Sequence, residues 1–427
     1  MIAPVARALR ASSVRPRAGR RPMIAPPRRA LRVASGVLVP VLAAGLLGGC
    51  TPTPAKASGK QLPGIDPTDF HHAGADPSGG ADGYVHVSTI AKHLEIPWGL
   101  GFLPDGSALV TERATLRILH VTPEGQITPL ARVTEATADN EGGLLGLAVS
   151  PQYKTDRTVF VYYTTKDDNR VARLRLDGRS RPQPILTGIP KGGIHDGGRL
   201  AFGPDGYLYA STGEASRTEA AQDLHNLGGK ILRMTTDGKP PPGNPFPHSL
   251  VWSYGHRNPE GMAWDANGTM YESEIGQAVW DELNIIRPGG DYGWPIVEGI
   301  GHNPKYIDPI VAWHPEVGVS SGVAVVGETA VVTCLRGQRI YLVPLGKTRA
   351  PSPEPSFDVT ASVRWRQGVG VSGRPVEALF EKYGRLRTAL AAPDGSVWIT
   401  TSNRDGRRPG GPTADDDRIL RLTLGPV

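Results

Sequence analysis

A short phrase recurs six times along this chain: an apolar strand, a turn of the Pro-Asp-Gly type and a second apolar strand. Clear copies begin at Phe102, Phe202 and Ala392, and degenerate copies begin at Val149, Trp264 and Val325. Such turns suit β-hairpins, because Pro fixes φ, Asp or Asn bonds back to the backbone and Gly takes a positive φ. The copies lie about 47 to 66 residues apart, which is typical of four-stranded propeller blades with loops of variable length.

The residues around these turns favour strands. Segments 108–112, 158–163, 208–212 and 397–401 are rich in β-branched and aromatic residues, and long helical periodicity is absent from the sequence. We therefore predict an all-β fold, a six-bladed β-propeller, with residues 84–87 or 418–422 closing the ring. The alternative is a large β-sandwich, a fold that rarely shows such a self-similar period.

The first 50 residues have a targeting composition, with nine arginines and no Asp or Glu. The apolar run 33–47 is shorter than the roughly 20 residues that a membrane-spanning helix needs, and it ends in Leu47-Gly48-Gly49-Cys50. This pattern predicts a signal peptide with a lipobox over 1–49 and a lipid anchor on Cys50. The product would be an exported lipoprotein at the outer face of the cytoplasmic membrane. A transmembrane anchor, a twin-arginine route through Arg28-Arg29 and a start at Met23 remain alternatives.

The charge of the remaining chain excludes a nucleic-acid footprint. Taking the nine leader arginines from the 47 basic residues leaves 38 against 41 acidic ones, so the net charge changes from +6 to −3. With Cys50 lipidated, Cys334 has no partner for a disulfide. Residues 50–83 are rich in Pro, Gly, Ala, Ser and Asp and are predicted to form a flexible tether, followed by one propeller domain over 84–427.

Propellers carry function in the loops at one mouth of the central channel, and the polar residues between the predicted strands are candidates for it. His195 lies among four glycines just before a strand and is a candidate general base, although a lone loop histidine is often incidental. Arg257 and Asn258 form a dense set of donors that could hold a carbonyl-rich anion. A turn in which Asn258 satisfies local backbone groups is the structural alternative.

Two further groups point to a cation and to carboxylates. Segment 272–284 offers several carboxylates and a glycine that can turn its carbonyl outward, as a hard cation such as calcium requires, but it lacks EF-hand spacing. Arg385 and Arg387 lie two residues apart, so on a strand both would face the same side, and Arg336 lies at the edge of the preceding blade. Solvated basic residues are the usual explanation for such pairs.

In this order and spacing, several of these segments resemble one family, the glucose/sorbosone dehydrogenase group, which includes soluble PQQ-dependent glucose dehydrogenases and aldose sugar dehydrogenases. The resemblance runs from about Ile96 to the C-terminus. The segments that carry it are 142–146, His195 with 198–200, 255–259, 281–284 with 292–295, and 384–387.

The resemblance implies a propeller with PQQ across the channel mouth and calcium beside it. His195 would be the base that takes the hydroxyl proton as hydride leaves the same carbon for PQQ. Arg257 and Asn258 would contact the quinone oxygens. The carbonyls of Gly276 and Gln277 would be calcium ligands, with support from Asp281. The PQQ carboxylates would be contacted by Arg336, Arg385 and Arg387. The substrate would be a sugar or polyol, and the sequence names no electron acceptor.

Four positions depart from the family pattern. Glu141 stands where the family often has a glutamine that contacts PQQ, and Ile194 replaces the acid that precedes the histidine of glucose dehydrogenases. Glu316 falls near a position usually occupied by a small hydroxyl residue, and Gln277 replaces a proline. We keep Glu141 among the predicted cofactor contacts, where its charge would need compensation by calcium or an arginine.

Two other functions fit a six-bladed propeller. One is a calcium-dependent hydrolase or lactonase, although such sites gather carboxylates and amides on the axis, whereas arginines converge here. The other is an extracellular binding module without catalysis, which Glu141 and Glu316 favour and His195, Arg257, Asn258, Arg385 and Arg387 oppose.

Overall fold

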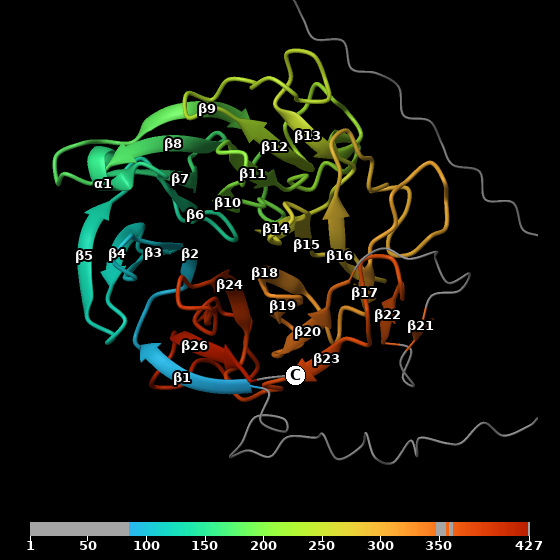
Figure 1. The fold of residues 1–427 in the computed structure, drawn as a ribbon. Helices are drawn as coiled ribbons and strands as arrows, with labels where there is room; N and C mark the ends of the chain where they lie inside the picture. The colour runs from blue at the N-terminus through green and yellow to red at the C-terminus, as the bar shows by residue number, and fades with distance from the viewer. Residues whose placement is uncertain (1–84, 347–355, 358–361, 426–427) are drawn as a thin grey trace, which may run out of the picture. The chain divides into compact units, whose positions relative to one another are not determined.

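A computed structural model describes residues 85–346, 356–357 and 362–425, so the predicted signal peptide, Cys50 and the tether lie outside the described residues. The described part contains 26 strands in six sheets, one short helix, α1 (Tyr153–Asp156), and a 3-10 turn, Thr218–Ala221. Figure 1 shows the six sheets arranged around a common centre, with their strands following one another outward. The predicted six-bladed β-propeller is confirmed.

Each of the first three blades is a meander of four consecutive strands. Blade 1 comprises β2 (Pro97–Phe102), β3 (Ala108–Glu112), β4 (Arg117–Val121) and β5 (Ile127–Arg132). Blade 2 comprises β6 (Leu144–Val149), β7 (Thr158–Thr164), β8 (Asn169–Arg175) and β9 (Gln183–Ile189). Blade 3 comprises β10 (Leu200–Phe202), β11 (Leu208–Thr212), β12 (Lys230–Met234) and β13 (Val251–Tyr254).

The last three blades are less regular. Blade 4 comprises β14 (Pro259–Trp264), β15 (Met270–Glu274), β16 (Asp281–Ile286) and β17 (Val311–Trp313), extended by β22 (Val363–Trp365) and β21 (Ser356–Phe357). Blade 5 comprises β18 (Ser320–Val326), β19 (Thr329–Cys334), β20 (Ile340–Pro344) and β23 (Val376–Ala378). Blade 6 comprises β24 (Leu386–Ala391), β25 (Val397–Thr401), β26 (Ile419–Leu424) and β1 (Val85–Ala91). The segment between β20 and β23 therefore lends two strands to the neighbouring blade.

The six recurring turns all occupy the same place in the fold, between the first and second strand of a blade. The first strands contact one another in a closed ring, from β2 through β6, β10, β14 and β18 to β24 and back to β2. Because each turn lies at one end of these inner strands, the loops that lead into the inner strands lie at the other end, together with those that follow the second strands. This second end is the mouth of the channel.

The core lies between neighbouring blades, where apolar faces of adjacent sheets pack together. β7 is buried along nearly its whole length, as its run of Val, Phe and Tyr side chains requires. The inner strands approach so closely that some positions accept only glycine. A Cβ placed on Gly146 would lie 2.1 Å from the carbonyl oxygen of Gly198 in the next blade, and one on Gly261 would lie 2.8 Å from that of Ser321.

Both segments proposed for closing the ring take part in it. β1 pairs antiparallel with β26, with Val85 opposite Leu424 and Ala91 opposite Ile419. Blade 6 therefore takes its outermost strand from the N-terminal side of the described chain and its other three from the C-terminal side. Residue Tyr84 of the predicted closing segment lies outside the described residues.

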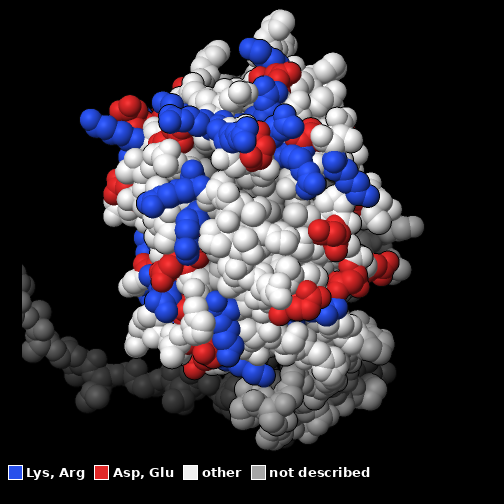
Figure 2. All heavy atoms as spheres, turned by 90° about the vertical axis from the view of Figure 1, so that its left-hand side faces the viewer, with Lys and Arg blue, Asp and Glu red and all other residues white. Residues whose placement is uncertain are grey.

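The outer surface carries charges of both signs. Figure 2 shows a band of lysines and arginines near the top of one side of the molecule, with acidic residues among them. Opposite charges also pair on the surface of the described residues, as Arg421 does with Asp394 at 2.5 Å. Among the residues that the structure describes, no helix is both long and apolar enough to cross a membrane.

Candidate active site

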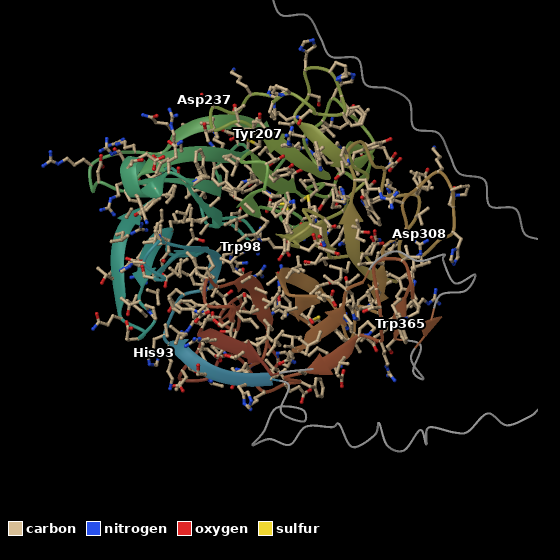
Figure 3. All side chains as sticks on the ribbon, viewed as in Figure 1. His93, Trp98, Tyr207, Asp237, Asp308 and Trp365 are labelled. Atoms are coloured by element: carbon tan, nitrogen blue, oxygen red, sulfur yellow. The ribbon has the colours of Figure 1, made fainter. Side chains whose placement is uncertain are left out.

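The mouth loops enclose one cavity of about 220 Å³, and every residue singled out from the sequence as a site residue lines it. These residues come from five blades, so only the closed ring brings them together. They are Glu141, His195, Arg257, Asn258, Gly276, Gln277, Asp281, Arg336, Arg385 and Arg387. Trp98 on β2 also lines the cavity, and Figure 3 shows it close to the centre of the ring.

The imidazole of His195 is held from both sides. Its Nδ1 is hydrogen-bonded to a carboxylate oxygen of Glu214, and its Nε2 lies 2.8 Å from Nη2 of Arg257. A guanidinium can only donate, so Nε2 must carry the lone pair, and Nδ1 must carry the proton that it donates to Glu214. The ring therefore presents a basic nitrogen to the cavity, as a general base requires.

Arg257 and Asn258 connect this histidine to the neighbouring blade. The Arg257 guanidinium donates to the carbonyls of Ile275 and Gly276, while its buried Nε has no partner among the described residues. The amide oxygen of Asn258 accepts a hydrogen bond of 3.0 Å from the backbone of Gly197, in the loop that carries the histidine. This N–H lies 61 residues away in the chain, so the contact is not the local turn of the structural alternative, and Asn258 also lines the cavity.

Arg385 and Arg387 both face the cavity, and each is also paired with a buried carboxylate. Nη2 of Arg385 lies 3.0 Å from Asp405, and Nη1 of Arg387 lies 2.8 Å from Glu260. Burial lowers the pKa of Arg385, because a buried cation loses its hydration. Arg336 is exposed and lines the same cavity.

Two more arginines, Arg113 and Arg407, line the cavity and were missed by the sequence analysis. Burial, and then the nearby charge of Arg387, lower the pKa of Arg113 to about 10. Arg113 is 8% exposed, and neither it nor Arg336 forms an ion pair with any carboxylate in the part of the chain that the structure covers. A buried, unpaired cation is costly, so the cavity is suited to an anion.

The repeat itself contained the signal for one of the missed residues. When the blades are compared, the residue that directly follows the second strand lies at the mouth of the channel. This place is held by Arg113 after β3, Ile275 after β15, Leu335 after β19 and Ser402 after β25, while Glu214 follows two residues after β11. Aligning the six blades on their turns would therefore have pointed to Arg113, whereas Glu214 lies one residue beyond the aligned position, which Gly213 holds. Arg407 lies further along its loop and has no such marker.

The loop 276–280 is wrapped around one carboxylate. Oε1 of Glu298 accepts hydrogen bonds from four successive backbone N–H groups, those of Gln277, Ala278, Val279 and Trp280, at 2.8 to 3.1 Å. Asp281 holds the start of the loop by accepting from the N–H of Gly276 at 2.9 Å. Burial raises the pKa of Asp281 to about 6. The carbonyl of Gly276, a predicted calcium ligand, accepts from Arg257 in this structure.

Behind the cavity lies a buried group of side chains that includes two carboxylates of segment 272–284, the segment considered for a cation above. Ligand atoms of His256, Glu272 and Glu274 all lie within 4.8 Å of one another. Nδ1 of His256 is 2.9 Å from Glu274, and the same carboxylate accepts from the backbone N–H of Arg257. Burial, and then the charge of Glu274, raise the pKa of Glu272 well above its usual range. This group supports the main chain of Arg257 from below.

The floor of the cavity is a polar cluster on the channel axis. Arg199 stacks on Trp98, with the guanidinium carbon 4.3 Å from the ring centre, and it donates to the carbonyl of Glu260 at 2.7 Å. The carboxylate of Glu260 accepts from Ser321 at 2.6 Å and from Arg387. Blades 1, 3, 4, 5 and 6 are thereby cross-linked directly under the site.

Comparison with known proteins identifies close relatives. The sequence profile of the family described as glucose / sorbosone dehydrogenase matches residues 94–408. Quinoprotein glucose dehydrogenase B of Acinetobacter calcoaceticus is 33% identical over 264 residues, which cover 53% of this chain and 54% of that protein. The aldose sugar dehydrogenase of Escherichia coli strain K12 is 33% identical over 230 residues, which cover 50% of this chain and 62% of that protein.

A solved structure is similar over most of its length. It is the PQQ-bound form of aldose sugar dehydrogenase from Streptomyces coelicolor, which superposes with a TM-score of 0.72 at 42% sequence identity, covering 80% of this chain and 99% of that one. The matched part of the chain thus spans little more than half of the two curated relatives but nearly all of this structure.

Proposed function

This chain belongs to the glucose/sorbosone dehydrogenase family, and we propose that it is an oxidoreductase that oxidises aldose sugars or related alcohols with PQQ as cofactor. The PQQ-bound relative from Streptomyces coelicolor supports the choice of cofactor. The substrate class follows from the sugar dehydrogenases among the relatives.

The observation that carries the proposal is the excess of arginine around the cavity. Six arginines line it, and two of them, Arg113 and Arg336, have no carboxylate partner among the described residues. PQQ carries three carboxylates, and guanidinium groups bind carboxylates through paired, charge-assisted hydrogen bonds. Arg336, Arg385 and Arg387 would hold them, with Arg113 adding a fourth cation. The buried Nε of Arg257, which has no partner among the described residues, would suit an acceptor on the cofactor.

His195 would act as the general base. The proton of the substrate hydroxyl would move to Nε2, while the hydride on the same carbon leaves and a carbonyl forms. PQQ, when bound, supplies the acceptor for that hydride. The carboxylate of Glu214 would stabilise the imidazolium that results, because it already accepts from Nδ1. Arg257, which donates to Nε2 in this structure, would first have to turn toward the cofactor oxygens so that this lone pair can accept the proton.

We also propose that calcium binds at the loop 276–280, through the carbonyls of Gly276 and Gln277 with Asp281 in support. Four backbone N–H groups on one side of this loop donate hydrogen bonds to Glu298. The opposite side of the loop faces the cavity. A cation there would act as a Lewis acid on the quinone. It would have to share the Gly276 carbonyl with Arg257 or displace that hydrogen bond.

The first experiment is reconstitution of the purified protein with PQQ and calcium, titrated by absorbance and followed by dye reduction with a panel of aldoses and polyols. We expect saturable binding and sugar-dependent reduction, with a loss of affinity when calcium is chelated. Absence of binding at micromolar PQQ would contradict the proposal. A binding module or a hydrolase would then be the better explanation.

We further propose that the chain is exported and anchored by a lipid on Cys50 at the outer face of the cytoplasmic membrane. The arginine-rich leader and the Leu47-Gly48-Gly49-Cys50 sequence support this. Expression with a labelled fatty acid tests it. The wild-type chain should incorporate label and fractionate with membranes, and Cys50→Ser should do neither. Equal labelling of both chains would exclude Cys50 as the anchor.

A further inference from the structure

The carboxylate of Glu141 connects two parts of the site that lie far apart in the sequence. Its Oε2 accepts a hydrogen bond of 2.8 Å from the backbone N–H of His195. Its Oε1 accepts one of 2.5 Å from Nη1 of Arg407, which is 266 residues away in the chain. His195 precedes the first strand of blade 3, whereas Arg407 follows the second strand of blade 6. One side chain therefore contacts both loops.

We propose that Glu141 is a positioning residue, which fixes the main chain of His195 and is itself oriented by Arg407, instead of a direct contact of the cofactor. The inference rests on the proposed function, because His195 is the proposed base. It differs from the role that the sequence assigned to Glu141, although the side chain still lines the cavity.

The backbone conformation of His195 is unfavourable by itself and needs hydrogen bonds to stabilise it. Its φ is +64°, in the left-handed region that side-chain-bearing residues seldom adopt. Two hydrogen bonds fix this conformation, one from its N–H to Glu141 and one from the N–H of Ala215 to its carbonyl at 3.0 Å. Without Glu141 the N–H would lose its partner, and the peptide could rotate away. Because the direction of the imidazole follows the main chain, Nε2 would then leave its place beside Arg257.

The charge of Glu141 is balanced inside the protein. Burial alone would raise the pKa of Glu141, but the hydrogen bond and the charge of Arg407 outweigh it, so the pKa lies below its usual range. The group therefore stays ionised at neutral pH, with its charge directed at Arg407. Both carboxylate oxygens already accept hydrogen bonds from the protein. The negative charge would also repel an anionic cofactor, so a direct contact is disfavoured.

Arg407 is in turn part of the arginine cluster. Its backbone N–H donates to Oδ1 of Asp405 at 2.9 Å, and Oδ2 of Asp405 accepts from Arg385 at 3.0 Å. A continuous set of contacts thus runs from the proposed base through Glu141, Arg407 and Asp405 to a proposed cofactor contact. The base and the cofactor would be placed by one shared network.

Three variants separate the two contacts of Glu141. Glu141→Gln keeps a carbonyl oxygen that can accept from His195 but removes the charge, Glu141→Ala removes both contacts, and Arg407→Gln removes only the ion pair. Arg421→Gln is the matched control, because Arg421 is 43% exposed in a 2.5 Å pair with Asp394 outside the cavity, whereas Arg407 is 49% exposed. Glu141→Ser takes the place of Glu141→Ala where that protein does not fold.

The first readout needs no cofactor. In protein labelled with ¹⁵N-histidine, the His195 amide, assigned from the signal that disappears in His195→Gln, reports the Glu141 contact through its hydrogen exchange. We expect exchange to accelerate about 10-fold or more in Glu141→Ala, as loss of one hydrogen bond allows, and to stay within about 3-fold of wild type in Glu141→Gln. Unchanged exchange in Glu141→Ala would overturn the inference.

The second readout is the distribution of the effect between kinetic constants. At saturating PQQ we expect Glu141→Ala to lower kcat about 10- to 100-fold with little change in the KM for sugar, because a misdirected base costs rate more than binding. Glu141→Gln should keep kcat within about 5-fold of wild type. Arg407→Gln breaks the same ion pair as Glu141→Gln, so by itself it should also keep kcat within about 5-fold of wild type, and it should add little in a Glu141→Ala background.

The outcomes distinguish this inference from the proposed function. A Glu141→Ala protein that loses PQQ affinity but keeps kcat and slow amide exchange would make Glu141 a cofactor contact and overturn the positioning role. Absence of PQQ-dependent turnover in the wild type would instead overturn the proposed function. The amide-exchange comparison would still decide whether Glu141 holds His195.

Discussion

At the scale of single residues, the hydrogen-bond partners of His195 determine which of its two ring nitrogens carries the proton. Glu214 accepts a hydrogen bond from Nδ1 of His195 and Arg257 donates one to Nε2, so two fixed partners select one tautomer. Neither partner is close to His195 in the sequence. The chemistry of this histidine is therefore a property of the folded ring and not of its glycine-rich loop.

Replacing the proposed base tests this arrangement. His195→Ala should lower turnover about 10²- to 10⁴-fold, the usual contribution of a general base, while the affinity for PQQ stays within about 3-fold of wild type. Absorbance titration and dye reduction on the same preparation give both values. His302→Ala is the control, because that side chain is 56% exposed and is no part of the cavity lining. Turnover near the wild-type rate would remove His195 as the base.

Arg385 offers a complementary test. Arg385→Ala should weaken PQQ binding about 10- to 100-fold, since hydrogen bonds to charged groups contribute about 1.5–3 kcal/mol, and should change kcat at saturating PQQ much less. Part of the loss would come from Asp405, which would keep its charge without its 3.0 Å partner. Titration of PQQ into both proteins measures the effect. An unchanged dissociation constant would contradict the proposed role.

The sequence identified site residues whose neighbours or spacing in the chain are distinctive, and it missed those without such a pattern. His195 stands out by its glycines, and Arg385 and Arg387 by their spacing, and all three line the cavity. Arg407 and Asp405 look like ordinary charged loop residues, because the partner of Arg407 lies in another blade and the partners of Asp405 lie about 20 residues away along the chain. The second role of Glu141 was equally invisible, since a contact over 266 residues leaves no pattern in the chain.

At the scale of elements, the inner strands are limited by how closely they approach one another. Gly146 on β6 faces Gly198 near β10, and there is no room between them for a methyl group. This packing lets loops from neighbouring blades converge on one cavity. Small residues on the inner strands are thus part of the construction of the site.

Enlarging that position should separate neighbouring blades. Gly146→Ala should lower the free energy of unfolding by about 1–3 kcal/mol, the usual cost of overpacking, and should weaken PQQ binding because the His195 loop shifts with Gly198. Thermal unfolding and PQQ titration measure the two effects. Gly373→Ala is the control, since a Cβ there would meet its nearest atom at 3.5 Å. Equal midpoints for the two variants would mean that the inner strands can separate freely.

The turns made the strands of each blade predictable. The exchange of two strands between blades 4 and 5 could not be predicted in this way. All six Pro-Asp-Gly-like phrases became the first hairpin of a blade, because turn chemistry is local. The placement of β21 and β22 beside β17 depends on which sheet edge is open, and that is known only once blade 4 exists. Sequence patterns specify strands better than they specify the partners of strands.

At the scale of the whole molecule, the ring depends on one strand from the other end of the described chain. A chain that starts at Lys92 lacks β1 and the buried side chains of Val85 and Ala91. Its free energy of unfolding should be lower by about 2–4 kcal/mol, from about 1.5–3 kcal/mol for Val85 and about 0.8 kcal/mol for the methyl group of Ala91. Denaturant unfolding against a chain that starts at Val85 checks this. Identical midpoints would show that the ring closes without β1.

The buried thiol of Cys334 reports the opening of the ring. Its side chain is fully buried on β19, and burial raises the pKa of the thiol far above its usual range, so the reactive thiolate is absent from the folded state. In a chain that starts at Thr51 it is the only cysteine. A thiol reagent should label it only as fast as the protein unfolds, and faster in the chain without β1. Rapid labelling of the folded protein would contradict this burial.

The pairing of Val85 with Leu424 also means that the place where the chain is interrupted is arbitrary with respect to the fold, while the order of the blades around the ring stays the same. Paired residues on adjacent strands lie about 5 Å apart, so a linker of a few residues could join these two positions. The chain could then be reopened between any two blades as a circular permutant. Opening it in the β9 to β10 loop would free the His195 segment at one side, whereas opening it in the β5 to β6 loop would free Glu141. Permutation would thus show which connection the assembled ring can do without.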